Sequence, residues 1–440
     1  MAALDVSNEV PSGDHGRPFT SAVLDLGAHG YVEEEWFVRG EATTYGPATG
    51  TALGNDGSWS TTPMGTATFS TRLLVRRPVD TARFDGTVVL EWLNVSGGID
   101  LDPVWAQSSA EIMRSGNTWV GVSAQRAGVN GPPFVPGFSQ PLTLWDPARY
   151  GTLDIPDDDA SYGIFTAAAR LAREGALTGG SPGELLIASG SSQSANRLVT
   201  YVNGVDALER AVDAFLVHGR VGTTCPTLAA GVTAPDPVVF RTDRAAPVLV
   251  LESEFDTLRS WQARQPDTAN FRLWELAGST HQDEFVERTL NAQFSRDLGH
   301  EQPGCDCAVN DMPFHYVENA ALSHLRAWVR HGEPPPELPR ISMNEDGDID
   351  RDHLGNARGG IRLPHLAVPV AQYGPVGTPT RCALRGFVKP FSAEQLTELY
   401  PSRDNYRERF DAATRDAVVS GFLLEPDAEE ARAFAERAYP

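Results

Sequence analysis

The chain has 440 residues, of which 41% are hydrophobic and 9% aromatic, so it is long enough to bury a large core. Its formal charge of −22 argues against nucleic acids and anionic membranes as partners, because both require a positively charged face. No apolar run approaches the roughly 20 residues that span a bilayer. Residues 1–18 also lack the basic start and apolar core of an export signal. We expect a cytoplasmic protein as the sequence stands, with an exported mature form left open.

The first strands are expected near the N-terminus, after a polar, Gly/Pro-rich segment at 1–30 that predicts irregular structure. Residues 31–42 and 67–77 interleave β-branched and aromatic with polar residues, which predicts antiparallel strands at one edge of a sheet. From Thr87 onward, short apolar runs alternate with helical patterns, which is typical of a mostly parallel sheet with helices on both faces. The expected strands lie at 88–90, 119–122, 185–187, 215–217, 248–251 and 271–274, and the expected helices at 103–115, 162–173, 192–202 and 285–294.

A Gly/Pro-rich crossing runs from Arg126 to Pro156 and is far longer than the usual α/β loop. Two interpretations are equally compatible with this segment: a lid formed by 126–160, or an irregular but rigid surface loop. The C-terminal part, 300–440, predicts a helical extension that packs onto the same α/β domain, so that 31–440 forms a single domain. Its expected helices lie at 313–330, 392–400, 404–420 and 427–438.

The pentapeptide Gly190-Ser191-Ser192-Gln193-Ser194 lies between a β pattern and a helical pattern. It is similar to the nucleophile elbow G-x-S-x-G, in which a tight turn presents a serine hydroxyl at the helix N-terminus. Ser192 is therefore the candidate nucleophile, with small residues two before and two after it, where strand and helix approach closely. Ser194 departs from the usual glycine. Registers centred on Ser191 or Ser194 fit less well.

A serine nucleophile needs a histidine base and a carboxylate that orients it. The run 247–251 leads into Glu252-Ser253-Glu254-Phe255-Asp256, just beyond the end of a predicted strand. Asp256 is the preferred acid and Glu254 the alternative, because alternation along a loop could aim either side chain inward. His281 follows the next strand and a small-residue turn, which reproduces the chain order Ser, Asp/Glu, His. His218 also ends an apolar run, but it would reverse that order.

Acyl transfer also requires N–H donors for the oxyanion. Gln193, the residue after the nucleophile, supplies the first, and Asn94 or Val95, in the loop after the third strand, the second. Aromatic residues near the expected pocket hint at an apolar or ring-bearing substrate, although such residues are more often core. They are Trp92, Trp105, Trp145, Tyr162 and Tyr373.

The four cysteines are too few for a disulfide scaffold of this size. Cys305 and Cys307 lack the two-residue spacing of common zinc knuckles, so we expect no metal and no cofactor. One bridge from Cys382 to the segment that carries Cys305 and Cys307 stays open, and Cys225 is left over.

With these segments in place, the chain resembles the α/β-hydrolase superfamily, in particular its bacterial, esterase-like α/β-hydrolase-domain family. The resemblance is carried by the stretches 91–98, 190–194, 252–256, 275–281 and 360–364. It implies an α/β-hydrolase fold and a serine hydrolase, most often an esterase, acting on a small-molecule ester. Acyltransferase, lactonase, thioesterase and amidase activities with the same triad remain alternatives, as does a non-catalytic binding protein on the fold. The sequence leaves the oligomeric state undetermined.

Overall fold

A computed structural model describes residues 4–439, which form two compact units. Of these residues, the first unit contains 4–248 and 289–301, and the second contains 249–288 and 302–439. Over the described part of the chain, none of the helices combines the length and the apolar character that crossing a bilayer requires.

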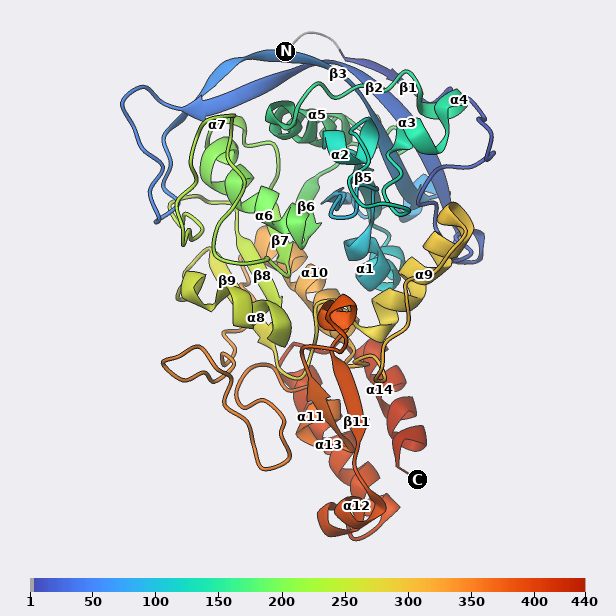
Figure 1. Cartoon of the computed structure of the whole chain (residues 1–440), viewed down its shortest axis with the longest axis vertical. Coiled ribbons are helices and arrows are strands. Elements are labelled where there is room, and N and C mark those ends of the chain that lie inside the picture. The colour runs from blue at the N-terminus through green and yellow to red at the C-terminus, as the bar shows by residue number, and fades with distance from the viewer. Residues whose placement is uncertain (1–3, 440) are drawn as a thin grey trace. The chain divides into compact units, whose positions relative to one another are not determined.

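The sheet of the first unit has antiparallel strands at one side and parallel strands at the other, as predicted. The order β1-β2-β3-β5 is antiparallel, and β5-β4-β6-β7 is parallel. Figure 1 shows β2 and β3 as a long paired ribbon, which extends well beyond the predicted segments. The strands are β1 Asp5–Ser7, β2 Tyr31–Pro47, β3 Thr61–Pro78, β4 Thr87–Trp92, β5 Thr118–Val122, β6 Leu185–Ser191 and β7 Ala214–His218.

The parallel strands β4, β6 and β7 are buried along their whole length, which explains their continuous runs of apolar residues. Helix α1 packs on β4, β5 and β6, and α6 packs on β6 and β7. The helices of this unit are α1 Pro103–Arg114, α2 Arg126–Val129, α3 Leu142–Trp145, α4 Pro147–Tyr150, α5 Ser161–Arg173, α6 Gln193–Thr200, α7 Asp206–Glu209 and most of α9 Glu284–Leu298.

The long crossing after β5 holds the short helices α2, α3 and α4. Its later part is tied to the body of the first unit: Asp154 pairs with Ser70 of β3, and the Trp145 indole donates to the Asp297 carbonyl. Phe134 and Val135, in its earlier part, expose more than a third of their surface. The crossing is therefore anchored at its end, and its role as a lid stays a prediction.

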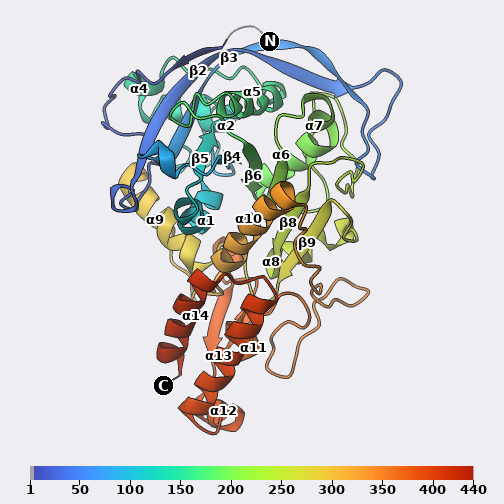
Figure 2. The same cartoon turned by 180° about the vertical axis from the view of Figure 1, so that it is seen from behind.

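The second unit contains two neighbouring strands, β8 and β9, and the C-terminal helices that the sequence predicts. Helices α13 and α14 pack side by side, as Figure 2 shows. An antiparallel pair, β10 and β11, was not predicted, because each strand has only four residues. The elements are β8 Val248–Ser253, α8 Glu254–Ser260, β9 Phe271–Leu276, α10 Phe314–His331, α11 Pro364–Ala367, β10 Ala371–Gly374, β11 Phe387–Pro390, α12 Ala393–Leu399, α13 Arg403–Val419 and α14 Glu425–Ala438.

Candidate active site

Ser192 lies at the turn between β6 and α6, where the sequence places the nucleophile. Its backbone has φ 60° and ψ −119°, a conformation that residues with a side chain rarely adopt. Its N–H donates to the carbonyl of His218 at 2.9 Å, which ties the turn to the end of β7. The chain is thus held in a strained strand-to-helix turn with a serine at its apex.

Small residues flank this turn for a geometric reason. A Cβ on Gly190 would lie 3.0 Å from the backbone carbonyl of Ser194 and 3.2 Å from a methyl group of Leu198. The Ser194 hydroxyl accepts the N–H of Ser191 at 3.0 Å and donates to the Ser191 carbonyl at 2.9 Å. The serine that replaces the usual glycine therefore closes the turn with two hydrogen bonds.

The predicted oxyanion donors lie in the first unit, beside this turn. Gln193 is the first residue of α6, so its N–H has no carbonyl one turn earlier in the helix. The N–H of Asn94 donates to the Leu101 carbonyl, and its side-chain amide donates to the Ser191 carbonyl, both at 2.9 Å. The Val95 N–H instead faces the side-chain oxygen of Gln193 at 3.4 Å. Of the two predicted second donors, Val95 is the one whose N–H is directed to a side chain of α6.

The loop after β4 is fixed by two buried ion pairs that the sequence reasoning missed. Asp100 accepts from Arg72 at 2.9 Å, and Asp102 accepts from Arg76 at 2.6 Å. All four side chains are fully buried, and burial raises the pKa of Asp102 while Arg76 opposes that rise. Breaking one such pair would leave a charge in the core, so the loop is firmly tied to β3. The available signal is a pair of arginines, Arg72 and Arg76, that flank the apolar run Leu73-Leu74-Val75 and lie on one face of the strand.

In the second unit, Asp256 and His281 form a hydrogen-bonded pair. Asp256 Oδ1 lies 2.6 Å from His281 Nδ1, with the carboxylate fully buried and the imidazole largely so. Asp256 Oδ2 accepts from the Ser253 hydroxyl at 2.6 Å, and the Ser253 hydroxyl accepts the Asp256 N–H in return. This reciprocal cap at the start of α8 fixes the carboxylate before it meets the imidazole.

Glu254, the alternative acid, has other partners. One of its oxygens accepts the N–H of Gly278 at 2.7 Å, and the other pairs with Arg351 at 2.7 Å. Burial raises the pKa of Glu254, and the Arg351 guanidinium opposes that rise. The imidazole contact is thus made by Asp256, while Glu254 supports the turn that precedes His281.

The nucleophile turn belongs to the first unit and the imidazole–carboxylate pair to the second. Among residues 4–439, no group of three or more His, Cys, Asp or Glu side chains is arranged to hold a metal ion.

The five aromatic residues predicted near the pocket are all buried among other protein groups. The Trp92 indole donates to the Gln125 side chain, and its ring stacks on Phe165. Trp105 packs against the Arg76 guanidinium. These contacts are those of core residues, and a role of the five in substrate binding stays a prediction. The others are Trp145, Tyr162 and Tyr373.

Comparison with known proteins gives the family. No curated protein matches the chain. An α/β serine hydrolase without lid from Xanthomonas campestris is 13% identical with a TM-score of 0.32, over 59% of this chain and 93% of its own. One of two fungal esterases from Rhizomucor miehei is 13% identical with a TM-score of 0.31, over 69% and 91%. A thermostable esterase from Pseudomonas putida is 16% identical with a TM-score of 0.27, over 53% and 67%.

These likenesses are too distant to carry an argument about activity. A match to the family described as alpha/beta hydrolase domain, by contrast, extends over residues 6–433. The chain therefore belongs to the alpha/beta hydrolase domain family.

Proposed function

We propose that the protein is a serine hydrolase that cleaves carboxylic esters through an acyl-enzyme intermediate. The observation that carries the proposal is the strained backbone of Ser192, at φ 60° between β6 and α6. Such a conformation costs about 1–3 kcal/mol, and strain of this kind clusters at functional sites. A serine held there has its hydroxyl at the N-terminus of a helix, where developing negative charge is stabilised.

His281 acts as the base in this proposal. Asp256 accepts the hydrogen bond of His281 Nδ1–H, so the lone pair of Nε2 is left to take the proton of the Ser192 hydroxyl. The serine oxygen attacks the acyl carbon, and the carbonyl electrons move onto the oxygen. When the tetrahedral intermediate collapses, the alcohol leaves with the proton from Nε2. Water, deprotonated by His281, then attacks the acyl-enzyme and releases the acid and the free serine.

The N–H groups of Gln193 and Val95 stabilise the oxyanion in this scheme. Gln193 begins α6, so its N–H has no intrahelical acceptor, and the buried pairs of Asp100 and Asp102 with β3 keep the loop that carries Val95 rigid. The side-chain oxygen of Gln193, 3.4 Å from the Val95 N–H, gives way to the substrate oxygen. Fixed donors of this kind are worth about 10²–10³ in kcat each.

The test is p-nitrophenyl acetate turnover by the full chain, with Ser192→Ala beside Ser191→Ala as the matched control. Ser191 is the neighbouring hydroxyl on the same turn, and its backbone forms the hydrogen bonds with Ser194 and Asn94. We expect Ser192→Ala to lose at least about 10³-fold in kcat and Ser191→Ala to keep most of the activity. Equal turnover by Ser192→Ala and the wild type would remove the proposal. Product analysis with added alcohols separates hydrolysis from acyl transfer.

A further inference from the structure

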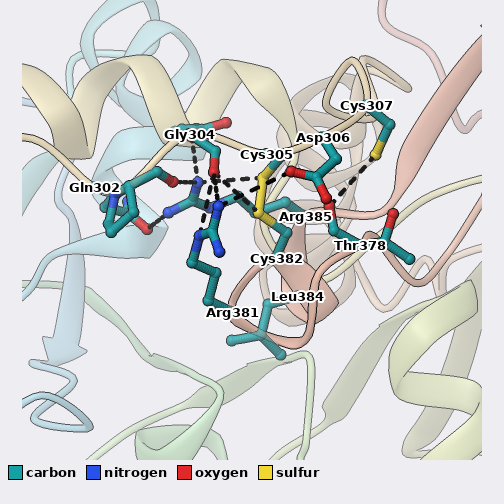
Figure 3. Close-up of a disulfide and its surroundings, with 12 residues drawn as sticks. Gln302, Gly304, Cys305, Asp306, Cys307, Thr378, Arg381, Cys382, Leu384 and Arg385 are labelled. Atoms are coloured by element: carbon teal, nitrogen blue, oxygen red, sulfur yellow. Dashed lines mark hydrogen bonds and ion pairs between the residues drawn. A yellow bond between two sulfur atoms is a disulfide. The ribbon is translucent and has the colours of Figure 1, made fainter.

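The disulfide between Cys305 and Cys382 lies in the second unit and joins two segments that are 77 residues apart in the sequence. Cys382 belongs to the 3-10 helix Thr380–Arg385, and its bridge ties that short helix to the segment that begins at Gln302 (Figure 3). The sequence left such a bridge open, and the structure shows which pair forms it.

The residues on both sides of His281 are bonded to this stapled helix. The Gln282 N–H donates to the Leu384 carbonyl at 2.8 Å. The Thr280 hydroxyl lies 2.8 Å from the same carbonyl and 2.8 Å from that of Pro375. Thr280 is almost fully buried, so these carbonyls replace water as its partners. The Leu384 carbonyl, two residues beyond Cys382, therefore binds both neighbours of His281, Thr280 and Gln282.

We infer that the Cys305–Cys382 disulfide is a positioning element for His281, which it acts on through the Leu384 carbonyl. The inference rests on the proposed function, because the position of His281 matters to activity only if His281 is the base. Catalytic groups tolerate little displacement, and an error of about 1 Å can cost about 10²-fold in rate. Opening the bridge frees the short helix to shift, and the hydrogen bond to Asp256 then no longer suffices to place the imidazole.

Other contacts of the short helix keep it near its place when the bridge opens, so the effect is graded. The Arg385 guanidinium donates to the Pro303 carbonyl at 2.6 Å and to the Gln302 side chain at 2.5 Å. The Arg385 guanidinium also pairs with Glu287 at 3.1 Å. Arg381 donates to the Gly304 carbonyl at 3.1 Å. Reduction therefore loosens a local element and leaves the fold in place.

Reduction by a dithiol supplies the two electrons that the step requires. A reductant thiolate attacks Sγ of Cys305, the partly exposed residue of the pair, and the S–S electron pair passes to Sγ of the buried Cys382, which takes a proton. The second reductant thiol then closes its own disulfide and releases Cys305 as a thiolate. Arg385 Nη1 lies 3.4 Å from Cys305 Sγ and stabilises that thiolate. The products are the Cys382 thiol, the Cys305 thiolate and one oxidised reductant.

The experiment compares oxidised and dithiothreitol-reduced protein in a Cys307→Ser background. The Cys307 thiol lies on the same segment, two residues from Cys305, and its removal prevents exchange into a different bridge. We expect reduction to lower kcat for p-nitrophenyl acetate about tenfold and to change KM less than about threefold. Activity returns on reoxidation, and thermal unfolding shows that the reduced protein remains folded at the assay temperature. A reduced protein with free thiols and unchanged kcat would overturn the inference.

A second variant tests the route without opening the bridge. Thr280→Val removes the hydroxyl beside the Leu384 carbonyl and nearly preserves the volume of the side chain. We expect it to lower kcat about tenfold in the oxidised protein, with reduction adding less than about twofold, because both changes act on one contact. Full activity in Thr280→Val, or effects that multiply, would refute the route. An oxidised wild type with no turnover would instead refute the proposed function.

Discussion

Replacing Asp256 with Asn tests the imidazole–carboxylate pair with little change of shape. The Ser253 hydroxyl accepts the backbone N–H of residue 256 and donates to Oδ2, so the atom at the Oδ2 position must be an acceptor. In the Asn variant, the amide oxygen takes that place and the amide NH₂ faces His281 Nδ1. Nδ1 must then accept a hydrogen bond, which moves the imidazole proton to Nε2. The base loses the lone pair with which it takes the serine proton.

The expected loss follows from this change of tautomer. The same exchange in a Ser-His-Asp triad lowers kcat by about 10⁴, which corresponds to about 5.4 kcal/mol of transition-state stabilisation. The fold is expected to survive, because the amide oxygen of Asn can accept from the Ser253 N–H and hydroxyl as the carboxylate oxygen does. We predict a kcat for p-nitrophenyl acetate that is lower by about 10³–10⁴ with KM nearly unchanged, and ¹⁵N NMR of the imidazole that reports a proton on Nε2.

Glu254→Gln is the matched control, since Glu254 is equally buried and only two residues away. A Gln can still accept the N–H of Gly278 and loses only the charge that pairs with Arg351. We expect its kcat to fall by less than about tenfold. The reasoning is refuted if Asp256→Asn keeps more than about a tenth of the wild-type kcat, or if Glu254→Gln falls as far as Asp256→Asn.

Three further predictions concern stability. Gly190→Ala places a methyl group 3.0 Å from the Ser194 carbonyl. We expect the free energy of unfolding in urea to fall by about 1–3 kcal/mol and kcat to fall as the turn shifts. Unchanged values would contradict the claim that the close approach requires a glycine. Reducing the Cys305–Cys382 bridge, which closes a 77-residue separation, is expected to lower the free energy of unfolding by at most about 4.5 kcal/mol on the chain-entropy model, and an unchanged urea midpoint would contradict this. Burial lowers the pKa of His365 to about 3. Between that pH and about 6.5, only the unfolded state binds the proton, so the free energy of unfolding decreases as the pH falls, by up to about 1.4 kcal/mol per pH unit. In the His365→Gln variant, we expect the urea midpoint to depend less on pH within this window. An unaltered pH dependence would show that another group is responsible.

The order of strands and helices could be predicted from the sequence, because each buried strand is a short apolar run and each long helix has a 3.6-residue pattern. The family resemblance and the mostly parallel sheet are confirmed by the match over residues 6–433 and by the strand pairing. The turn at Ser192 can be predicted because its geometry requires small residues at fixed offsets, and the pentapeptide 190–194 has them.

The sequence favours Asp256 but keeps Glu254 as an alternative, because alternation along a loop could aim either side chain inward, whereas the segment is helical. Ser253 and Asp256 are separated by three positions, the spacing of a capping box, and that signal predicts the start of α8 at Glu254. On a helix, residues two apart point in different directions, so the two carboxylates serve different partners. The disulfide partner of Cys382 could not be predicted, because two cysteines lie within two residues of each other and only the path of the chain decides between them.

The central claim is that Ser192 is a nucleophile activated by His281. Its most direct test is peptide-resolved mass spectrometry after reaction with a fluorophosphonate, which forms a stable covalent bond to an activated serine oxygen. The account predicts an adduct on Ser192 in the wild type, formed at least about 10²-fold more slowly in His281→Gln. An adduct on Ser191 or Ser194, or equally fast labelling without the imidazole, would contradict it.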